Sequence, residues 1–546
     1  MIRRLPKIGY KASIARTSFY KTPFCKISWF TLTSAILISG CTSQIKELPK
    51  EVNVNVPEKW EVIITERIND SDPTINSDLA PSPIPQPIQV ETTIEETPVV
   101  NGWSNSFNDP KLNKHIETAL NNNPDLLSSA ATLKAAIENI TITGANLWPS
   151  VSANLSNTNT DIDEGGISTE VRTVSGTLTV GWEADVWGRL TQRKKSAAYS
   201  ALAQSELYKF AELSLVANVI RAWYNLVTNK LQLDLSHQRL DSFKRTADLI
   251  DENYQRGIRS ALDVYSSRTD VQTQISALAD TKFNYIESLR AFKTLLGKYP
   301  DLALEFTADL PDLEQTIPAG LPAELLTRRP DIRASEFQYK AQIATAKAAN
   351  RDRYPSITFT GTISDSRNKF NQLFDDNNMV LSLISGIAQP VFQAGALKSN
   401  EKQAIYQAEA AYADLVRTTL IAYEEVENSL SRETLLIEQR DALQEAVDLA
   451  ENGFELALDR YQSGIENYTT VLESQRRLFD SKRSEINVRN AILQNRISAH
   501  LALGGDFSEI PRTGDNDLPS VISANEDNKT VISASDETLD KEQVLP

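Results

Sequence analysis

The stretch YQRGI at residues 254–258 returns as YQSGI at residues 461–465, which is 207 positions later. Upstream, NPD at 123–125 returns as RPD at 329–331, an offset of 206. Offsets this long lie far outside the roughly 20 to 50 residues of solenoid repeats. The sequence therefore predicts one architecture that is written twice, as two pseudo-equivalent halves.

The N-terminal segment resembles a lipoprotein signal peptide over residues 1–40. Residues 1–26 carry seven basic side chains and no acidic one, and the apolar stretch that follows is shorter than the ~20 residues of a membrane-spanning helix. It ends in LISGC at 37–41, which resembles a bacterial lipobox, where the chain is cut before the cysteine and the cysteine is acylated. Only Cys25 and Cys41 occur, and the predicted cleavage would remove Cys25. Cys41 would then have no disulfide partner, and lipidation explains why an exported protein carries it. The alternative is that Cys41 is an incidental buried thiol.

Two further segments lie outside the predicted core. Residues 41–100 form an acidic linker with the proline-rich run 81–87, which predicts an extended, lipid-anchored tether. Residues 508–546 are acidic and rich in Ser, Asn and Thr, which predicts a disordered tail. Loss of the signal peptide moves the formal net charge from −16 to −23, which argues against nucleic acid as a partner.

Between these ends, each half is predicted to contain a pair of strands and a pair of long helices. The first half covers 101–300 and the second 301–507. The predicted strands are 149–157, 172–185, 355–364 and 379–391. The predicted long helices are 189–255, 262–296, 395–461 and 467–503.

Periodicity supports these assignments. Val151, Ala153 and Leu155 alternate with polar residues, which is the period of a strand with one polar face. In the long helix that follows, apolar residues recur with 3, 4, 3, 4 spacing from Leu240 to Tyr254, the seam of a coiled coil. At 1.5 Å per residue this helix is roughly 100 Å long, too long for an ordinary globular domain.

Four strands cannot close a barrel, because the smallest closed barrels need about eight, and open sheet edges do not occur in lipid. If the strands lie in a membrane, the chain must therefore oligomerise, and three copies give twelve strands. The alternative is a soluble sheet packed on helices, since strand alternation looks the same in both.

Three segments resemble those of TolC-type outer membrane factors, specifically the lipoprotein branch of the RND-type multidrug efflux channels. These segments are WEADVWGR at 182–189, LTRRPDIRA at 326–334 and QPVF at 389–392, and the likeness extends over about 101–507. It implies an α+β membrane protein: a trimeric 12-stranded outer-membrane β-barrel with four strands per chain, continued by a long periplasmic α-helical coiled-coil barrel, with an internal two-fold structural repeat.

The same resemblance implies two docking tips at the periplasmic end. Gly257 and Ile258 form one tip, and Gly464 and Ile465 form the other; both would dock on the hairpins of a periplasmic adaptor. Glycine suits such a turn because it permits positive φ and the close approach of a partner backbone. The alternative is that these glycines merely end helices.

An aperture at the second tip is also implied, around Tyr461, Val471 and Glu473. Three symmetry-related Glu473 carboxylates would form a charged ring that attracts cations, with Val471 as the neighbouring aliphatic constriction. The alternative for a single Glu is a solvated helix face. Some family members carry an Arg two residues after this glycine that holds the gate shut, but Glu466 stands here, which puts that latch in doubt.

The sequence contains no catalytic constellation. Its three histidines, His115, His237 and His500, are far apart, and no motif for a nucleophile, a metal or a phosphate occurs. We therefore expect neither an enzyme nor a cofactor or metal site. The predicted function is a passive exit duct in the outer membrane of a Gram-negative bacterium, with a homotrimer, a periplasmic adaptor, an inner-membrane pump and outer membrane lipid as partners. The alternative is a lipid-anchored coiled-coil adaptor or scaffold without a pore.

Overall fold

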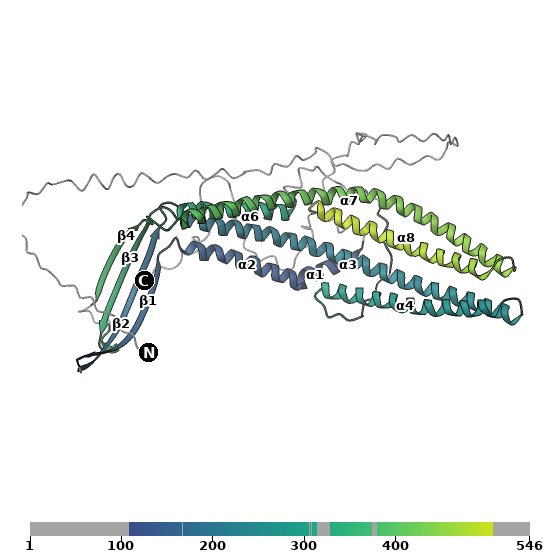
Figure 1. The fold of residues 1–546 in the computed structure, drawn as a ribbon, viewed down its shortest axis with the longest axis horizontal. Helices are drawn as coiled ribbons and strands as arrows, with labels where there is room; N and C mark the ends of the chain where they lie inside the picture. The colour runs from purple at the N-terminus through teal and green to yellow at the C-terminus, as the bar shows by residue number, and fades with distance from the viewer. Residues whose placement is uncertain are drawn as a thin grey trace, which may run out of the picture. The chain divides into compact units, whose positions relative to one another are not determined.

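The computed structural model describes residues 107, 109–165, 167–304, 306, 308–313, 328–373 and 379–505. Within these ranges the chain forms long helices and one four-stranded sheet (Figure 1). The helices of the first part are α1 (Pro110–Asn122), α2 (Pro124–Ala145), α3 (Arg189–Gln255) and α4 (Ala261–Leu295). Those of the second part are α6 (Pro330–Arg351), the short 3-10 helix η3 (Phe370–Gln372), α7 (Ala396–Gln462) and α8 (Tyr468–Ala502). The strands are β1 (Ser150–Glu164), β2 (Ile167–Ala184), β3 (Ser356–Arg367) and β4 (Val380–Ala388).

The strand bounds differ from those predicted. β1 extends to Glu164 and β2 begins at Ile167, because the two strands stay paired residue for residue up to their hairpin. That outer part carries polar residues on both faces and so gives no hydrophobic alternation. β4 ends at Ala388 and not at 391, since Pro390 has no N–H to donate to a ladder. The four long helices lie within one residue of their predicted bounds.

Two short helices are stacked on the ends of two others, and this stacking explains the repeated NPD and RPD stretches. The Asn123 side chain caps α2 and also donates to the last carbonyl of α4, Leu295 O, at 2.9 Å. Arg329, at the start of α6, donates to Ala502 O of α8 at 3.1 Å. Gly297 (φ +68°) permits the close approach in the first stack, because an added Cβ would lie 2.3 Å from Asn122 O. α2 and α4 therefore follow one another along α3.

The long helices are held in a fixed lateral order. α3 packs against α2, α4, α6 and α8, whereas α7 packs against α6 and α8. α6 and α8 therefore lie between the two longest helices. Among the described helices, none is long and apolar enough to cross a membrane.

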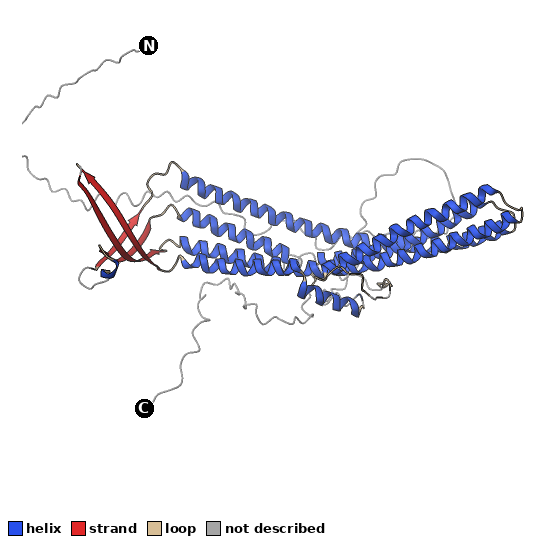
Figure 2. Cartoon of the chain, turned by 90° about the horizontal axis from the view of Figure 1, so that it is seen from below, coloured by secondary structure: helices blue, strands red, loops and turns tan. Residues whose placement is uncertain are grey.

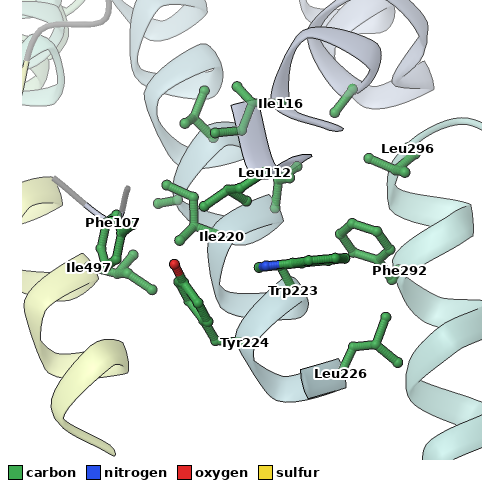
Figure 3. Packing of buried hydrophobic residues seen from close by; sticks show 14 of the residues in the cluster. Phe107, Leu112, Ile116, Ile220, Trp223, Tyr224, Leu226, Phe292, Leu296 and Ile497 are labelled. Atoms are coloured by element: carbon green, nitrogen blue, oxygen red, sulfur yellow. The ribbon is translucent and has the colours of Figure 1, made fainter. Parts of the chain in front are cut away.

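The largest apolar core gathers where α1 lies across α3 and α4 (Figure 3). The helix α1 was not predicted; it begins at the N-cap Asp109 with Pro at its first position, a standard start signal. Its Leu112 and Ile116 are fully buried beside Trp223 of α3 and Phe292 of α4. The Trp223 indole nitrogen donates to Asp109 at 2.9 Å, so this core also fixes the start of α1.

The sheet is antiparallel throughout and has the order β1-β2-β3-β4, so β1 and β4 are its edges within one chain. It lies at one end of the long helices, and the two helical turns lie at the other (Figure 2). Residues directly opposite in the register share a face. One face carries apolar side chains, such as Leu178 opposite Ile363 and Ile363 opposite Leu381, and all three are exposed. The other face carries mostly hydroxyl side chains.

Candidate functional site

The candidate site is built at the helical end, where α3 turns into α4 and α7 turns into α8. Both turns close in the same way: Gly257 N donates to Tyr254 O and Ile258 N to Asn253 O, each at 2.9 Å. In the second turn, Gly464 N donates to Tyr461 O and Ile465 N to Arg460 O. This is the Schellman arrangement, in which a glycine with positive φ ends a helix. The two glycines have φ +75° and +79°.

The residue after each glycine is apolar and points to solvent. Ile258 is 60% exposed and Ile465 is 66% exposed. An added Cβ at Gly257 or Gly464 would meet no atom within 4 Å, so the positive φ alone accounts for glycine within the chain. Helix capping therefore explains the glycines, but not the two exposed isoleucines.

Arg259 joins the two turns, and sequence reasoning missed it. Its guanidinium donates from Nη2 to Tyr461 O at 2.7 Å and to Glu466 O at 3.4 Å, and it lies 4.1 Å from the centroid of the Tyr461 ring. A cation suits these carbonyls because the end of α7 carries partial negative charge. The sequence does contain a signal for it. The predicted latch was an Arg two residues after the glycine of the second turn, where Glu466 stands, and Arg259 occupies the same position after Gly257 in the first turn.

Below the turns, an apolar cluster joins four helices. Tyr461 and Val471 are fully buried there, packed with Ile250 of α3, Val264 of α4 and Tyr468 of α8. The Val471 side chain is thus enclosed by its own chain, and its predicted place at an aperture stays a prediction. Tyr461 likewise faces this cluster and Arg259.

A second polar contact joins α4 to α8 one turn further from the tip. The Tyr468 hydroxyl donates to Asp270 Oδ2 at 2.9 Å, and Arg476 Nη2 donates to Asp270 Oδ1 at 2.8 Å. Burial and this hydrogen bond raise the pKa of Tyr468, so the phenol stays protonated. Asp270 thus connects two side chains of α8 to α4.

Further along, α3 and α8 meet through polar pairs. We call this row the polar seam; it consists of the pairs Ser242–Gln475 (2.8 Å), Arg239–Asp480 (3.0 Å), Gln232–Asn487 (2.5 Å) and Asn225–Asn490 (3.0 Å). Gln475 is fully buried although it is polar. Polar residues at core positions of a coiled coil fix its register at a cost in stability. The contact between the two helical hairpins therefore combines this row of specific polar pairs with the apolar clusters on either side of it.

Glu473 lies in a different environment from Val471. It is exposed and lines an open groove of about 470 Å³ together with Leu443, Arg476, Arg477 and Asp480. The Glu466 carboxylate, in the turn between α7 and α8, accepts from Thr470 Oγ1 of α8 at 3.3 Å. The structure thus brings Tyr461 and Val471 together in a packed core and leaves Glu473 on a surface.

The segment at 182–189 organises the passage from strand to helix. Asp185 accepts from Leu190 N at 2.9 Å and Thr191 N at 2.8 Å, which caps α3 in place of Gly188. Arg189 pairs with Glu183 at 2.7 Å and with Asp352 at 3.4 Å. These contacts fix the direction in which α3 leaves the sheet.

Within the described ranges, no cluster of three or more His, Cys, Asp or Glu side chains could hold a metal ion. Cys41, the predicted lipidation site, lies outside the described residues. The site is thus a set of helix turns and contacts between helices, which suits docking and movement.

Comparison with known proteins agrees with this arrangement. The sequence profile described as "Outer membrane efflux protein" matches residues 115–298 and 321–505. The chain belongs to the outer membrane efflux protein family. This is a family of transport proteins and not of enzymes.

Among curated relatives in this family, the toluene efflux pump outer membrane protein TtgF of Pseudomonas putida is 30% identical over 356 residues. That alignment covers 63% of this chain and 73% of TtgF. The probable outer membrane lipoprotein SilC of Salmonella typhimurium is 26% identical over 374 residues, covering 67% of this chain and 81% of SilC. As an outer membrane efflux protein, this chain is an exit duct located in the outer membrane.

Solved structures of outer membrane channels share the fold. CusC superposes with a TM-score of 0.68 at 25% identity, over 78% of this chain and 99% of CusC. The CmeC outer membrane channel of Campylobacter jejuni superposes with a TM-score of 0.70 at 20% identity, over 80% of this chain and 95% of CmeC. The sheet and the long helices described above are thus those of the fold that these outer membrane channels share.

Proposed function

We propose that three copies of this chain form a twelve-stranded barrel in the outer membrane, continued by a coiled-coil tunnel in the periplasm. The observation that carries the proposal is the sheet: it has four strands, two edges unpaired within one chain, and one exposed apolar face. A barrel needs about eight strands to close, and lipid tolerates no open edge. Edge β1 of one copy would pair with edge β4 of the next, which closes the sheet.

Aromatic side chains at the helical border of the sheet support a membrane boundary there. The rings of Trp182 and Phe359 stack with centroids 5.6 Å apart, and those of Trp187 and Tyr354 with centroids 5.4 Å apart. All four are exposed. Girdles of aromatic residues flank the apolar band of outer-membrane barrels, so this border would lie at the periplasmic surface of the bilayer.

The equal lengths of corresponding helices support two equivalent halves, 101–300 and 301–507. α3 and α7 each contain 67 residues, α4 and α8 each 35, and α2 and α6 each 22. Three copies would then place six equivalent helical hairpins around the tunnel. A periplasmic adaptor would dock on their tips at Gly257-Ile258 and Gly464-Ile465, and an inner-membrane pump would supply the energy.

At the start of the mature chain, Cys41 would be acylated and hold the chain to outer membrane lipid. The acidic segment 41–100 would be the tether behind it, after removal of residues 1–40. This anchor is independent of the barrel and adds to its attachment.

The closed state of the duct would rest on the contacts between the two hairpins. Arg259 would serve as the latch at the first tip. It would thus supply the basic side chain that the second tip lacks, where Glu466 stands in place of an Arg. Adaptor binding at Ile258 and Ile465 would separate the hairpins along the polar seam, whose hydrogen bonds can be exchanged for water at little cost. Glu473 would line the mouth, while Val471 stays in the apolar cluster.

The mass and the conductance of the purified mature protein test this function. We expect a mass of three chains and small currents in a planar bilayer. Glu473→Ala should leak more ions in the absence of adaptor, because it removes a ring of three charges that holds counter-ions at the mouth. An oligomer whose mass is not a multiple of three would overturn the trimer, and silence of both proteins despite confirmed insertion would favour the poreless, lipid-anchored scaffold.

A further inference from the structure

One face of strand β3 carries a hydroxyl at every position. Ser356, Thr358, Thr360, Thr362, Ser364 and Ser366 alternate with the residues of the opposite face over the whole strand. Successive side chains of a strand point to opposite sides, so these six form one continuous row. No structural need of the sheet demands hydroxyls in all six positions, because apolar β-branched residues suit a strand equally well.

The register extends this row across the sheet. Thr362 lies opposite Thr179 of β2 and Ser382 of β4, and Thr179 in turn lies opposite Ser152 of β1. One level further out, Ser364 lies opposite Thr177, which lies opposite Asn154. At the next level the Ser156 and Ser175 hydroxyls are 2.7 Å apart and share a hydrogen bond. Most of the face is therefore a lattice of hydroxyl and amide groups. On the edge strand β4 it also carries Val380 opposite Ser364 and Ile384 opposite Thr360.

The charge on this face lies at its helical end. Of its side chains that the structure describes, only Glu183 is ionisable, and it pairs with Arg189 at 2.7 Å beside the helices. At the other end, Asp365 and Arg367 point to the opposite face and pair with each other at 3.0 Å. The middle levels of the face carry no net charge.

The assignment of this face to the lumen rests on the proposed function. In a closed barrel the apolar face, which includes Leu178, Ile363 and Leu381, would contact lipid. The hydroxyl faces of the three chains would then line the lumen. Rings of charged side chains give pores their selectivity, and apolar constrictions close pores by losing water. Hydroxyl groups do neither, because each one both donates and accepts hydrogen bonds and rotates to suit the solute.

We propose that the membrane-level wall of the duct is an uncharged, mainly hydroxyl surface that passes anionic, cationic and uncharged solutes alike. Discrimination by charge is then confined to the helical tunnel and its mouth at Glu473. The low-dielectric walls of a pore focus the field of any fixed charge, so a wall without charge is what a duct for solutes of either sign requires.

Cysteine modification tests the wall directly. Thr362→Cys places one thiol per chain on the hydroxyl face, and Ile363→Cys places one on the neighbouring apolar position. Each assembled protein in vesicles would be treated with a cationic and with an anionic methanethiosulfonate, and each rate divided by the rate of the same reagent with a free thiol in water. The mature wild-type protein, whose Cys41 would be acylated, serves as the blank.

For Thr362→Cys we expect both reagents to react, with normalised rates within about fivefold of each other, and we expect Ile363→Cys to resist both. Thr362→Cys with Thr179→Glu places a carboxylate directly opposite the thiol and should favour the cationic reagent, which proves that the assay senses charge. A larger bias in the single Thr362→Cys protein would overturn the neutral wall and leave the duct standing. Reaction at Ile363→Cys with protection of Thr362→Cys would overturn the barrel itself.

Discussion

At the scale of single residues, the most informative side chain is Arg259. It fills three roles at once: it caps the carbonyl end of α7, stacks on Tyr461 and bridges two turns that are about 200 positions apart in the chain. A guanidinium suits this place because its planar fork can donate to two carbonyls and stack on a ring. The neighbouring Arg256 is exposed, and among the described residues its side chain has only a 3.7 Å ion-pair contact, with Glu252 of α3.

These two arginines give a matched pair of variants. Arg259→Ala should weaken the contact between the hairpins by about 2 kcal/mol, the sum of a cation–π contact and hydrogen bonds to carbonyls, and should raise the leak conductance of the adaptor-free channel several-fold. Arg256→Ala should change stability by less than about 0.5 kcal/mol and leave the leak as it is. Equal currents from both variants in planar bilayers would rule out Arg259 as the latch.

His500, near the end of α8, makes stability depend on pH. Burial, together with the neighbouring Arg496 charge, lowers the pKa of His500 to about 4. In the unfolded chain the His500 imidazole is protonated near pH 6.5. Between pH 6.5 and pH 4 the unfolded state therefore binds a proton at His500 that the native state does not bind. The free energy of unfolding should therefore fall by about 3 kcal/mol per chain across that window and no further below it.

We expect His500→Gln to lose part of this acid sensitivity. Thermal unfolding of the purified protein at pH 7.0 and pH 4.5 would measure it, with His237→Gln, an exposed histidine on α3, as the control. A drop in unfolding temperature that is the same in the wild type and in His500→Gln would show that the acid lability comes from other groups.

At the scale of secondary structure elements, two different kinds of contact join the α3–α4 hairpin to the α7–α8 hairpin. An apolar cluster holds the tip, whereas the polar seam joins α3 to α8 behind it. A buried polar pair resists separation less than an apolar contact does, because water can replace its hydrogen bonds. The elements are therefore arranged so that the hairpins can part once the tip contacts are broken.

Replacing one pair of the seam by apolar residues should hold the hairpins together. With Ser242→Ala and Gln475→Met both partners become apolar, which is close to neutral or stabilising. Added to Arg259→Ala, this double change should lower the leak of that variant by at least half. Ser474→Ala, which removes a hydroxyl bonded to Thr470 O of the same helix, is the control and should not lower it; an undiminished leak in the apolar variant would mean that opening does not pass through the seam.

At the scale of the whole molecule, the sheet of one chain is open at both edges. These two edges are unpaired, and the apolar strand face is exposed, with Leu383 at 79%. Both features are costly in water, and the proposed assembly of copies in a bilayer would remove them. Assembly and membrane insertion are thus expected to be one coupled process.

Adjacent residues of β4 test this coupling. Leu383→Lys puts a charge on the apolar face, which costs about 2–4 kcal/mol at the bilayer midplane, and should sharply lower the yield of trimer in the outer membrane. Ser382→Lys puts the same charge on the opposite face and should assemble normally while making the channel favour anions. If Ser382→Lys were the damaging change, the assignment of the two faces would be reversed.

The sequence by itself determined the local features of this protein. Strand alternation, the heptad seam of the long helices and the glycine turns depend on the spacing between near neighbours in the sequence. The repeat of residues 254–258 at 461–465 then located the corresponding elements of the second half. Of the predicted site, the tip residues Ile258 and Ile465 and the residue Glu473 are exposed in the structure, and their roles stay predictions.

The tertiary structure alone decided which distant residues meet. It enclosed Val471, which reads as an ordinary aliphatic residue of a helix, and it brought Arg259 to Tyr461 and Asp270 to Arg476. It also joined α3 to α8 through side chains that look like solvated helix faces in the sequence. The physical reason is that periodicity shows only that a face is buried or polar, whereas the partner of that face depends on how whole helices pack in order and register, and this is set by all of their contacts together.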